Sequence, residues 1–428
     1  MDHKETLIKE IIMKFIHIAD LHLGKSVHGV SMIENGDQGY WVDHFIEVLR
    51  TVSPHAVLIA GDVFDRSAPS EDAIALFSRM MTAINDLGIP VMTVAGNHDS
   101  VHRLSYVGPV LSKQDLFFSR SLTNSYELEH VTITDPDNGE PVTFWLMPYV
   151  FPLLVARAMG DESLRDYDSA VRALLAAQPI DFSKRNVLIA HQNVTFNGQE
   201  VERGGSESMV GGVGQIDASA FFDFDYVALG HIHSAYPVGR ESIRYAGTPL
   251  CYHFNETRQQ QKGPVLVEMG PKGEPLKIET IVIEPLHPMR EIPADSFENI
   301  RDRELENNNT GEYIKVTLND RRVSPEIWTF FRNLYNSRGS ILMELTSEYN
   351  QFCGSVSGKS SAVQDKSVEE LFAEFYTERN KGEPPEEKDI QLMKYAGELM
   401  RNAKELNKVP EPGSVDALID FLLKSEDK

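Results

Sequence analysis

Cysteine is nearly absent from this chain. Its 428 residues include only two cysteines, Cys251 and Cys353, and neither belongs to a metal-type motif. Such scarcity excludes a disulfide-stabilised scaffold, and we expect a reducing, cytoplasmic location without structural disulfides. Any metal ion bound here therefore needs oxygen and imidazole ligands from aspartate, asparagine and histidine.

Long apolar runs are also missing. No segment reaches the ~18 uninterrupted apolar residues that a membrane-spanning helix requires, and the N-terminus shows no signal-peptide pattern. With 41% hydrophobic and 25% charged residues, the composition is that of a globular protein. The chain is too long for one ordinary hydrophobic core, so we expect two or three domains and no membrane association.

Positive charge is in deficit. The chain has 41 Lys and Arg against 64 Asp and Glu, which gives a formal net charge of −23 at pH 7. Proteins bind phosphate backbones through basic side chains, so this balance argues against strong unaided affinity for nucleic acid. Chemistry on nucleic acid is not excluded, because a metal centre brings its own positive charge and a partner subunit can supply a basic surface.

Five short polar motifs directly follow runs of strand-forming residues. In chain order they are Asp20-Leu21-His22, Gly61-Asp62-Val63-Phe64-Asp65, Gly96-Asn97-His98-Asp99, His191-Gln192 and Gly230-His231-Ile232-His233. Helical spacing of apolar residues over 40–52 and 71–87 places helices between the first strands, which predicts parallel pairing. Loops at the carboxyl ends of parallel strands are where α/β proteins place functional groups. The motifs therefore predict one shared site.

The donor atoms in these motifs suit a pair of divalent cations that share a bridging carboxylate. Asp20 and His22 stand two residues apart in an extended segment and can chelate one ion. Asp62 follows the second strand and is the natural bridge. Mixed nitrogen and oxygen donors without thiolate favour manganese, iron or zinc over calcium. The predicted metal ligands are Asp20, His22, Asp62, Asn97, His191, His231 and His233.

His98 stands next to a predicted ligand but is suited to a different task. The departing alkoxide of a phosphoester needs a proton, and histidine is the side chain best placed to give one near neutral pH. Asp65, three residues after the predicted bridge, would orient and charge His98. Arg66 is either a contact to a substrate phosphate or a surface arginine, and the sequence leaves both possibilities open.

Beyond the motifs, the sequence predicts further units. Strands at 141–147 and within 236–283 lack intervening helices, which predicts a second, mixed sheet packed on the first. The glycine-rich residues 195–215 are interpreted as a substrate-facing loop or a disordered one. Prolines cluster at 285–293 and indicate a break. A small α/β unit follows, with strands at 313–318 and 341–345 and a helix at 324–336.

These features divide the chain into five parts. We expect an N-terminal extension (1–13), an α/β domain that carries the motifs (14–286), a small α/β unit (287–346), a linker (347–366) and a helical region (367–428). Three apolar stripes in the helical region have no obvious core to cover. They are therefore expected to bind a partner or to mediate self-association.

The ordered motifs resemble the signature of the calcineurin-like metallophosphoesterases, D-x-H, G-D-x-x-D, G-N-H-D, H and G-H-x-H, at every position. The flanking residues are similar to those of the SbcD family of bacterial nucleases within that superfamily. The segments that carry this similarity are Ile18-Ala19-Asp20-Leu21-His22-Leu23-Gly24, Ala60-Gly61-Asp62-Val63-Phe64-Asp65, Ala95-Gly96-Asn97-His98-Asp99-Ser100 and Val227-Ala228-Leu229-Gly230-His231-Ile232-His233. The resemblance implies a four-layer αββα sandwich of two mixed sheets, with a small α/β capping domain and a C-terminal helical tail.

The resemblance also implies how the site residues divide their work. A first ion would be held by Asp20, His22, Asp62 and His233, and a second by Asp62, Asn97, His191 and His231. His98 would be the general acid, paired with Asp65. The family prefers manganese, degrades duplex DNA from 3′ ends, and cuts single strands and hairpins together with an SbcC-type coiled-coil ATPase.

We therefore expect a manganese-dependent DNA nuclease for end processing, repair and recombination. Its helical tail would bind the SbcC-type ATPase. The chain would form a homodimer within a heterotetramer. The alternative is a small-molecule phosphodiesterase or phosphatase with the same core, which would need neither a capping unit nor a tail. A scaffold that only binds the ATPase is a third possibility, and the complete ligand set argues against it.

Overall fold

The computed structural model describes residues 12–198 and 214–349, except 107, 124, 136–138 and 259–260, together with residues 373, 376 and 385. The predictions for most of the N-terminal extension, most of the 195–215 segment, nearly all of the linker and most of the helical region lie outside these residues. Among the helices of the described part, none combines the length and the apolarity that a membrane crossing requires.

The first of two six-stranded sheets has the order β16-β15-β1-β4-β5-β6. Its strands are β1 (Met13–Ile18), β4 (Ala56–Ala60), β5 (Val91–Val94), β6 (Leu116–Phe118), β15 (Val265–Met269) and β16 (Lys277–Thr280). β1, β4, β5 and β6 pair in parallel, and β15 and β16 continue the sheet in antiparallel fashion. The helices α1 (Asp37–Val52), α2 (Glu71–Asp86), α3 (Val101–Ser105) and α4 (Gly108–Leu111) occur between its strands in sequence.

The second sheet has the order β13-β14-β12-β9-β8-β7 and is also mixed. Its strands are β7 (Glu129–Thr134), β8 (Pro141–Met147), β9 (Arg185–His191), β12 (Tyr226–Gly230), β13 (Tyr236–Val238) and β14 (Arg240–Tyr245). The prediction for this sheet was partly wrong, because β15 pairs with β1 and β16 pairs with β15, so both belong to the first sheet. The helices α5 (Pro152–Met159) and α6 (Tyr167–Ala176) lie against the second sheet.

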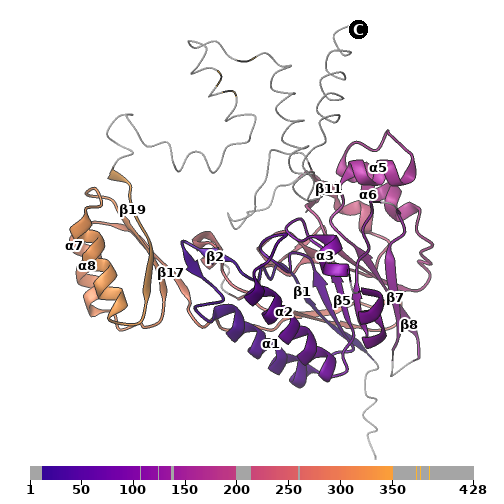
Figure 1. Ribbon diagram of the computed structural model, residues 1–428, viewed down its shortest axis with the longest axis horizontal. Coiled ribbons are helices and arrows are strands. Elements are labelled where there is room, and N and C mark those ends of the chain that lie inside the picture. Colours follow the sequence, from indigo (N-terminus) through magenta and orange to yellow (C-terminus); the bar gives the residue numbers. More distant parts are fainter. Residues whose placement is uncertain are drawn as a thin grey trace, which may run out of the picture. The chain divides into compact units, whose positions relative to one another are not determined.

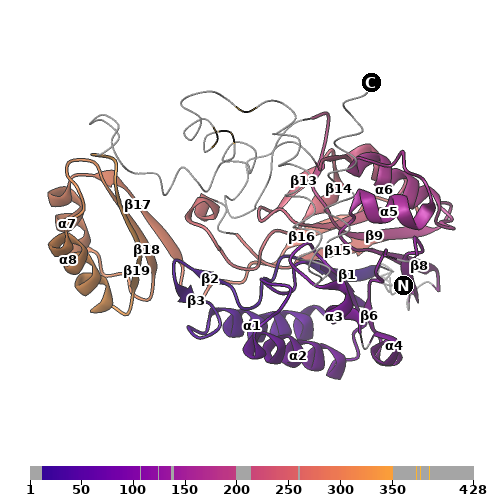
Figure 2. The same ribbon diagram turned by 45° about the horizontal axis from the view of Figure 1, so that its top comes forward.

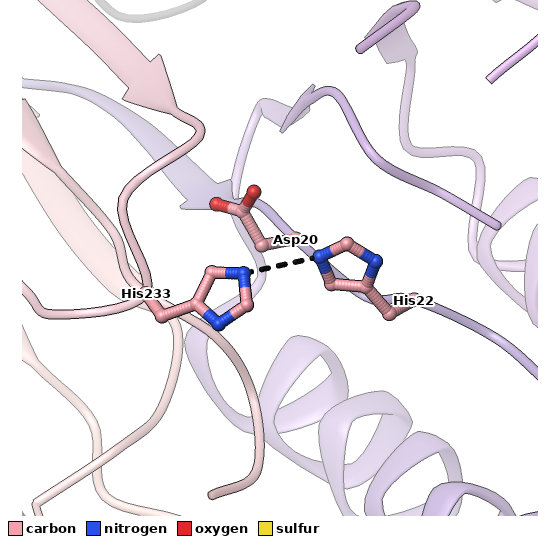
Figure 3. Close-up of side chains that lie close together, drawn as sticks. All are labelled: Asp20, His22 and His233. Atoms are coloured by element: carbon pink, nitrogen blue, oxygen red, sulfur yellow. Dashed lines mark hydrogen bonds between the residues drawn. The ribbon is translucent and has the colours of Figure 1, made fainter. Parts of the chain in front are cut away.

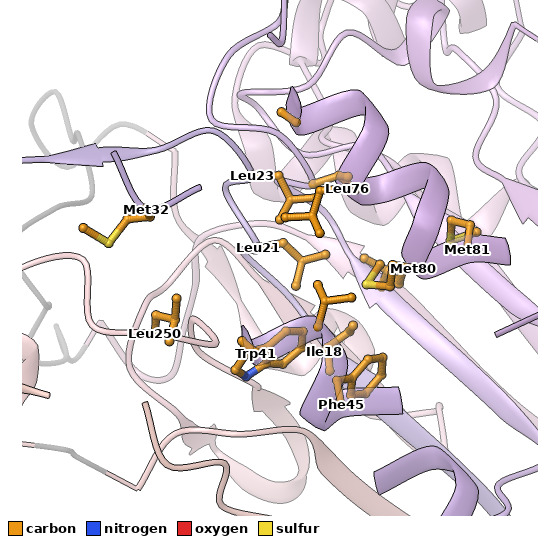
Figure 4. Close-up of a cluster of buried hydrophobic side chains, with 14 of the residues drawn as sticks. Ile18, Leu21, Leu23, Met32, Trp41, Phe45, Leu76, Met80, Met81 and Leu250 are labelled. Atoms are coloured by element: carbon orange, nitrogen blue, oxygen red, sulfur yellow. The ribbon is translucent and has the colours of Figure 1, made fainter. Parts of the chain in front are cut away.

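Alternation of side chains along the strands produces the layers. Phe15 and Leu58 on the first sheet and Phe144 on the second belong to one buried cluster between the sheets. The opposite face of the first sheet packs on α1 and α2 through a separate cluster that includes Trp41 and Met80 (Figure 4). Figures 1 and 2 show the two helix pairs, α1 with α2 and α5 with α6, on opposite sides of the sheets. The predicted four-layer α/β sandwich is therefore confirmed.

A separate three-stranded parallel sheet follows, formed by β17 (Met289–Asp295), β18 (Tyr313–Leu318) and β19 (Ile341–Ser347). Two helices, α7 (Phe297–Glu306) and α8 (Pro325–Asn336), supply its core with Ile300, Phe331 and Tyr335. The sequence suggested only a proline-rich break where β17 lies. Pro293 is accommodated because β17 is an edge strand and its pairing shifts register after Ile292.

Shorter elements complete the described part. They are the paired strands β2 (Ser26–Val27) and β3 (Val30–Ser31), the paired strands β10 (Val194–Thr195) and β11 (Ile216–Asp217), and the 3₁₀ turns η1 (Ser112–Gln114), η2 (Ala218–Phe221) and η3 (Phe254–Arg258). β10 and β11 pair in parallel and bracket the glycine-rich segment.

Candidate metal centre

The predicted ligands lie just beyond the carboxyl ends of five strands from both sheets. Asp20, Asp62 and Asn97 follow β1, β4 and β5 of the first sheet. The remaining donors come from the second sheet, where His191 ends β9 and the His231-Ile232-His233 segment follows β12. A hydrogen bond joins the two sets, because the backbone N–H of His231 donates to the Asp20 carboxylate at 3.0 Å.

Several ligands occupy a backbone conformation that residues other than glycine rarely adopt. The φ angles are 54° for Asp20, 44° for His22, 48° for Asp62 and 105° for His231. Positive φ at a residue with a Cβ costs on the order of 1–3 kcal/mol and persists only where the surroundings fix it. The clustering of four such residues at one place is typical of a functional site.

Two motif glycines permit the close approach of the ligand loops. A Cβ placed on Gly96 would lie 2.1 Å from Oδ1 of Asp62. A Cβ on Gly61 would lie 2.3 Å from Nδ1 of His191. Both distances are far below van der Waals contact, so a larger residue at either position would displace a predicted ligand.

Asp20, His22 and His233 form one group of donors whose ligating atoms lie within 4.8 Å of one another. Figure 3 shows the two imidazole rings facing each other beside the carboxylate, with their Nε2 atoms 3.2 Å apart. Oδ2 of Asp62 lies 3.7 Å from Nε2 of His22. All four side chains are almost fully buried, as a set of ligands around a small cation requires.

Asp62 also reaches the second group. Its Oδ2 lies 3.4 Å from Nε2 of His191. Oδ1 of Asn97 lies 3.0 Å from the same nitrogen and 3.1 Å from Nδ1 of His231. The structure thus brings all the predicted ligands together, with Asp62 between the two groups as expected for a bridging carboxylate.

Hydrogen bonds set the ring orientation of two histidines. Nδ1 of His191 lies 2.8 Å from the carbonyl oxygen of Ala60. A carbonyl only accepts, so Nδ1 carries a proton and Nε2 is the ring nitrogen that faces Asp62 and Asn97. Nδ1 of His233 lies 3.4 Å from a carboxylate oxygen of Glu256. Such partners hold metal-binding histidines in the required tautomer, so the donor set fits a pair of divalent cations.

The pKa values show how the buried site responds to proton binding. Burial raises the pKa of Asp20 to about 7 and lowers that of His231 to about 3. Burial also opposes ionisation of Asp62, but cationic His191 and His98 hold its pKa well below the usual range. Burial disfavours the His191 cation, while Asp62 raises its pKa to about 9. Protons held by such groups are displaced when a cation binds.

His98 lies at the edge of this centre with its side chain 35% exposed. Its Nε2 is 4.0 Å from Oδ2 of Asp62, and its backbone N–H donates to Oδ1 of the same carboxylate at 2.9 Å. The predicted pairing with the Asp65 carboxylate is wrong in one respect, because Nδ1 of His98 contacts the Asp65 backbone carbonyl. The carboxylate points instead toward Lys25, at 2.8 Å, and lies 3.7 Å from Nδ1 of His22.

The sequence did not indicate the groups that support the ligands. The Asp99 carboxylate accepts from the backbone N–H groups of Val63, Phe64 and Gly96 and so connects two ligand loops. Its place in the Gly96-Asn97-His98-Asp99 motif was the available clue. Glu256 lies outside any motif, and only the fold brings it to His233. Arg66 is 82% exposed, with its Nε 3.8 Å from Oδ2 of Asp65.

Comparison with known proteins agrees with this geometry. The family model described as calcineurin-like phosphoesterase matches residues 13–235. A protein of Staphylococcus epidermidis, named as the SbcD subunit of the nuclease SbcCD, is 32% identical over 311 residues, which cover 72% of this chain and 79% of that protein. The chain belongs to the calcineurin-like phosphoesterases, among the SbcD nuclease subunits. It is accordingly a phosphodiester hydrolase.

A second relative extends the similarity. The protein of the same name from Staphylococcus saprophyticus is 29% identical over 367 residues, which cover 85% of this chain and 92% of that protein. A further family model, described as Type 5 capsule protein repressor C-terminal domain, matches residues 285–380. That match begins just before β17 and includes the whole three-stranded sheet.

Proposed function

We propose that this chain is a two-metal DNA nuclease that works with an SbcC-type ATPase and uses manganese. The observation that carries the proposal is the position of Asp62, whose Oδ2 lies within 3.7 Å of both His22 and His191. One carboxylate between two groups of nitrogen and oxygen donors is the arrangement that phosphodiester-cleaving metal pairs use. The family membership assigns the same class of reaction.

Each side chain has a definable part in the reaction. Asp20, His22, Asp62 and His233 would hold one cation, and Asp62, Asn97, His191 and His231 the other. Bound divalent cations supply charge neutralisation at the phosphate and activate water for attack. His98 donates through Nδ1 to the Asp65 carbonyl, so its protonated form presents Nε2–H toward the centre. In the proposed reaction that proton goes to the departing 3′ oxygen.

The charge of the chain favours a shared substrate site. A net charge of −23 repels DNA overall, so we propose that affinity for duplex ends comes from the cations and from a partner. The two relatives are named as subunits of the nuclease SbcCD, which supports an SbcC-type partner. We propose a homodimer within a heterotetramer, the helical region at 367–428 binding the ATPase, and a β17–β19 unit that acts as the capping domain.

The deciding experiment compares two kinds of substrate with the same enzyme. Linear duplex DNA labelled at the 5′ end, a DNA hairpin and a simple aryl phosphodiester are each incubated with Mn²⁺, with and without an SbcC-type ATPase and ATP. We expect shortening from 3′ ends and hairpin opening that depend on the partner. Turnover of the aryl ester alone would favour a small-molecule phosphodiesterase. Replacing Mn²⁺ by Mg²⁺, Zn²⁺ or Ca²⁺ tests the choice of metal.

A metal-binding measurement accompanies these assays. Asp62→Ala removes the carboxylate common to both groups of donors, so both cations should be lost. Titration calorimetry with Mn²⁺ should give two ions for the wild-type chain and none of comparable affinity for the variant. Two tightly bound ions in the variant would contradict the bridging role.

A further inference from the structure

Gln38 is a buried amide that none of the ligand assignments uses. It lies in the first turn of α1 with only 2% of its surface exposed. Its Nε2 donates to the carbonyl oxygen of His22 at 2.8 Å and lies 3.3 Å from that of Leu21. Its Oε1 accepts from the backbone N–H of Gly24 at 3.0 Å. One side chain therefore binds three residues of the segment that follows Asp20.

This segment needs such support because its backbone is strained. His22 has a φ of 44°, and Asp20 has a φ of 54°. The loop after β4 holds one side of the segment, since the N–H of His22 donates to the carbonyl of Asp62 at 2.9 Å. Gln38 holds the other side through the His22 carbonyl. The position of the His22 imidazole thus depends on bonds at both of its backbone groups.

Tyr252 completes the same network. Its hydroxyl donates to the carbonyl of Leu21 at 2.6 Å and lies 3.0 Å from Nε2 of Gln38. Burial of an amide is unfavourable unless its donors and acceptor are all bonded. Here both ends of the Gln38 side chain are bonded, so the network holds the segment in one geometry.

The neighbouring residue, Asp37, points to a different part of the fold. Its carboxylate lies 2.9 Å from Nδ1 of His287 and accepts from the Tyr313 hydroxyl at 2.5 Å. Asn35 donates to the same hydroxyl. Tyr313 begins β18, and only 1% of its surface is exposed. Two consecutive residues of α1 therefore bind the β17–β19 unit and the His22 segment.

We propose that Asp37 and Gln38 form a positioning link between the β17–β19 unit and the first metal-binding group. Gln38 sets the position of His22, and the contact of Asp37 with Tyr313 sets the first turn of α1. A movement of the β17–β19 unit would therefore change the affinity of the first group for its cation, while the group formed by Asn97, His191 and His231 stays unaffected. This inference rests on the two-metal site of the proposed function.

The test measures binding of Mn²⁺, alone and without DNA, to the full chain. Gln38→Met keeps the length of the side chain but removes its hydrogen bonds. One of the two ions should bind at least about tenfold more weakly, the effect expected when a group that supports a ligand is lost. The other ion should bind as in the wild-type chain. Calorimetry gives both affinities, and electron paramagnetic resonance of Mn²⁺ reports whether a coupled pair still forms.

Gln178→Met is the matched control. Gln178 also binds two carbonyl oxygens and one backbone N–H, those of Tyr126, Leu174 and Leu128, but away from the metal centre. It should lower thermal stability about as much as Gln38→Met and leave both Mn²⁺ affinities unchanged. Equal weakening of both ions in Gln38→Met, or of neither, would overturn the link.

Tyr313→Phe tests the other end of the link without touching the ligand segment. It removes the hydroxyl bonded to Asp37, and it should weaken the same single ion by a smaller factor. Combined with Gln38→Met, its effect should be less than additive, because both act on one structural element. Independent effects, or no effect of Tyr313→Phe on Mn²⁺ binding, would overturn the coupling. A chain that binds two ions but cuts no DNA would instead contradict only the proposed function.

Discussion

Nδ1 of His98 lies 2.9 Å from the backbone carbonyl oxygen of Asp65. The main chain, rather than a carboxylate, therefore orients the ring. A carbonyl has no proton to give, so it fixes Nδ1 as the donor and leaves Nε2 directed to the metal centre.

His98→Ala should retain both cations and lose cleavage. Removal of a general acid lowers turnover by a factor on the order of 10²–10⁴, whereas no predicted ligand is changed. Single-turnover cleavage of duplex DNA and Mn²⁺ calorimetry on the same preparation separate the two effects. Retained nuclease activity would rule out the general-acid role.

Asp65→Asn should have a much smaller effect than His98→Ala. The substitution keeps the backbone carbonyl that orients His98 and removes the charge that lies beside Lys25 and His22. We expect the cleavage rate to fall by less than about tenfold. Loss of the general acid should instead lower the rate by a factor on the order of 100 or more. Equal losses in the two variants would show that the Asp65 carboxylate acts directly on His98.

Gly96→Ala should weaken binding of both cations by at least about tenfold, because the new methyl group would collide with the Asp62 carboxylate. Mn²⁺ calorimetry measures the loss. Gly108→Ala is the control, since a Cβ at that position meets no atom within 4 Å. Full metal affinity in Gly96→Ala would mean that the loop can shift without moving Asp62.

Asp135→Ala should destabilise the fold by about 3–5 kcal/mol, the usual effect of removing one partner of a buried ion pair. Arg185 and Asp135 are 2% and 0% exposed, and Nη1 lies 3.1 Å from Oδ2. Glu47→Ala, which breaks an exposed pair with Arg50, should leave the urea unfolding curve unchanged. If both substitutions lowered the free energy of unfolding equally little, the buried ion pair would not stabilise the fold as expected.

His17 should make stability depend on pH. It is fully buried, with Nδ1 3.0 Å from the Tyr226 hydroxyl, and burial lowers its pKa to about 3. The unfolded chain takes up this proton near pH 6.5, so the contribution is complete above that pH and is lost as the pH falls. Between pH 8 and pH 5 the wild-type chain should lose about 2 kcal/mol more than His17→Gln. Urea unfolding at both pH values measures this difference. If the wild-type chain and His17→Gln lost the same free energy of unfolding between pH 8 and pH 5, the role of His17 would be refuted.

Local pattern sufficed to select the candidate ligands that the fold gathers at one place, because they follow short apolar strands and belong to recognisable motifs. It also predicted α1, α2 and β18, whose apolar residues follow a clear periodicity. The support around the ligands was not predictable in this way. Gln38, Glu256 and Asp99 act through hydrogen bonds to backbone or imidazole atoms, and polar residues at such positions look like ordinary surface residues until the fold is known.

The sequence also did not show to which sheet each strand belongs. Val265–Met269 and Lys277–Thr280 follow the strands of the second sheet in the chain, which suggested that they join it. Val265–Met269 instead pairs with β1, about 250 residues earlier in the chain, and Lys277–Thr280 pairs with Val265–Met269. A local pattern of alternating apolar and polar residues predicts a strand, but it does not indicate which distant strand will pair with it.

The two sheets supply the candidate ligands at different times during synthesis of the chain. Asp20, His22, Asp62 and Asn97 come from the first sheet, whereas His191, His231 and His233 come from strands made much later. A growing chain that ends before residue 187 lacks the three histidines from the second sheet. It therefore has neither complete metal-binding group, and its second sheet is unfinished. Its first sheet also lacks β15 and β16. The proposed metal centre therefore cannot be complete until the strands of both sheets have been made.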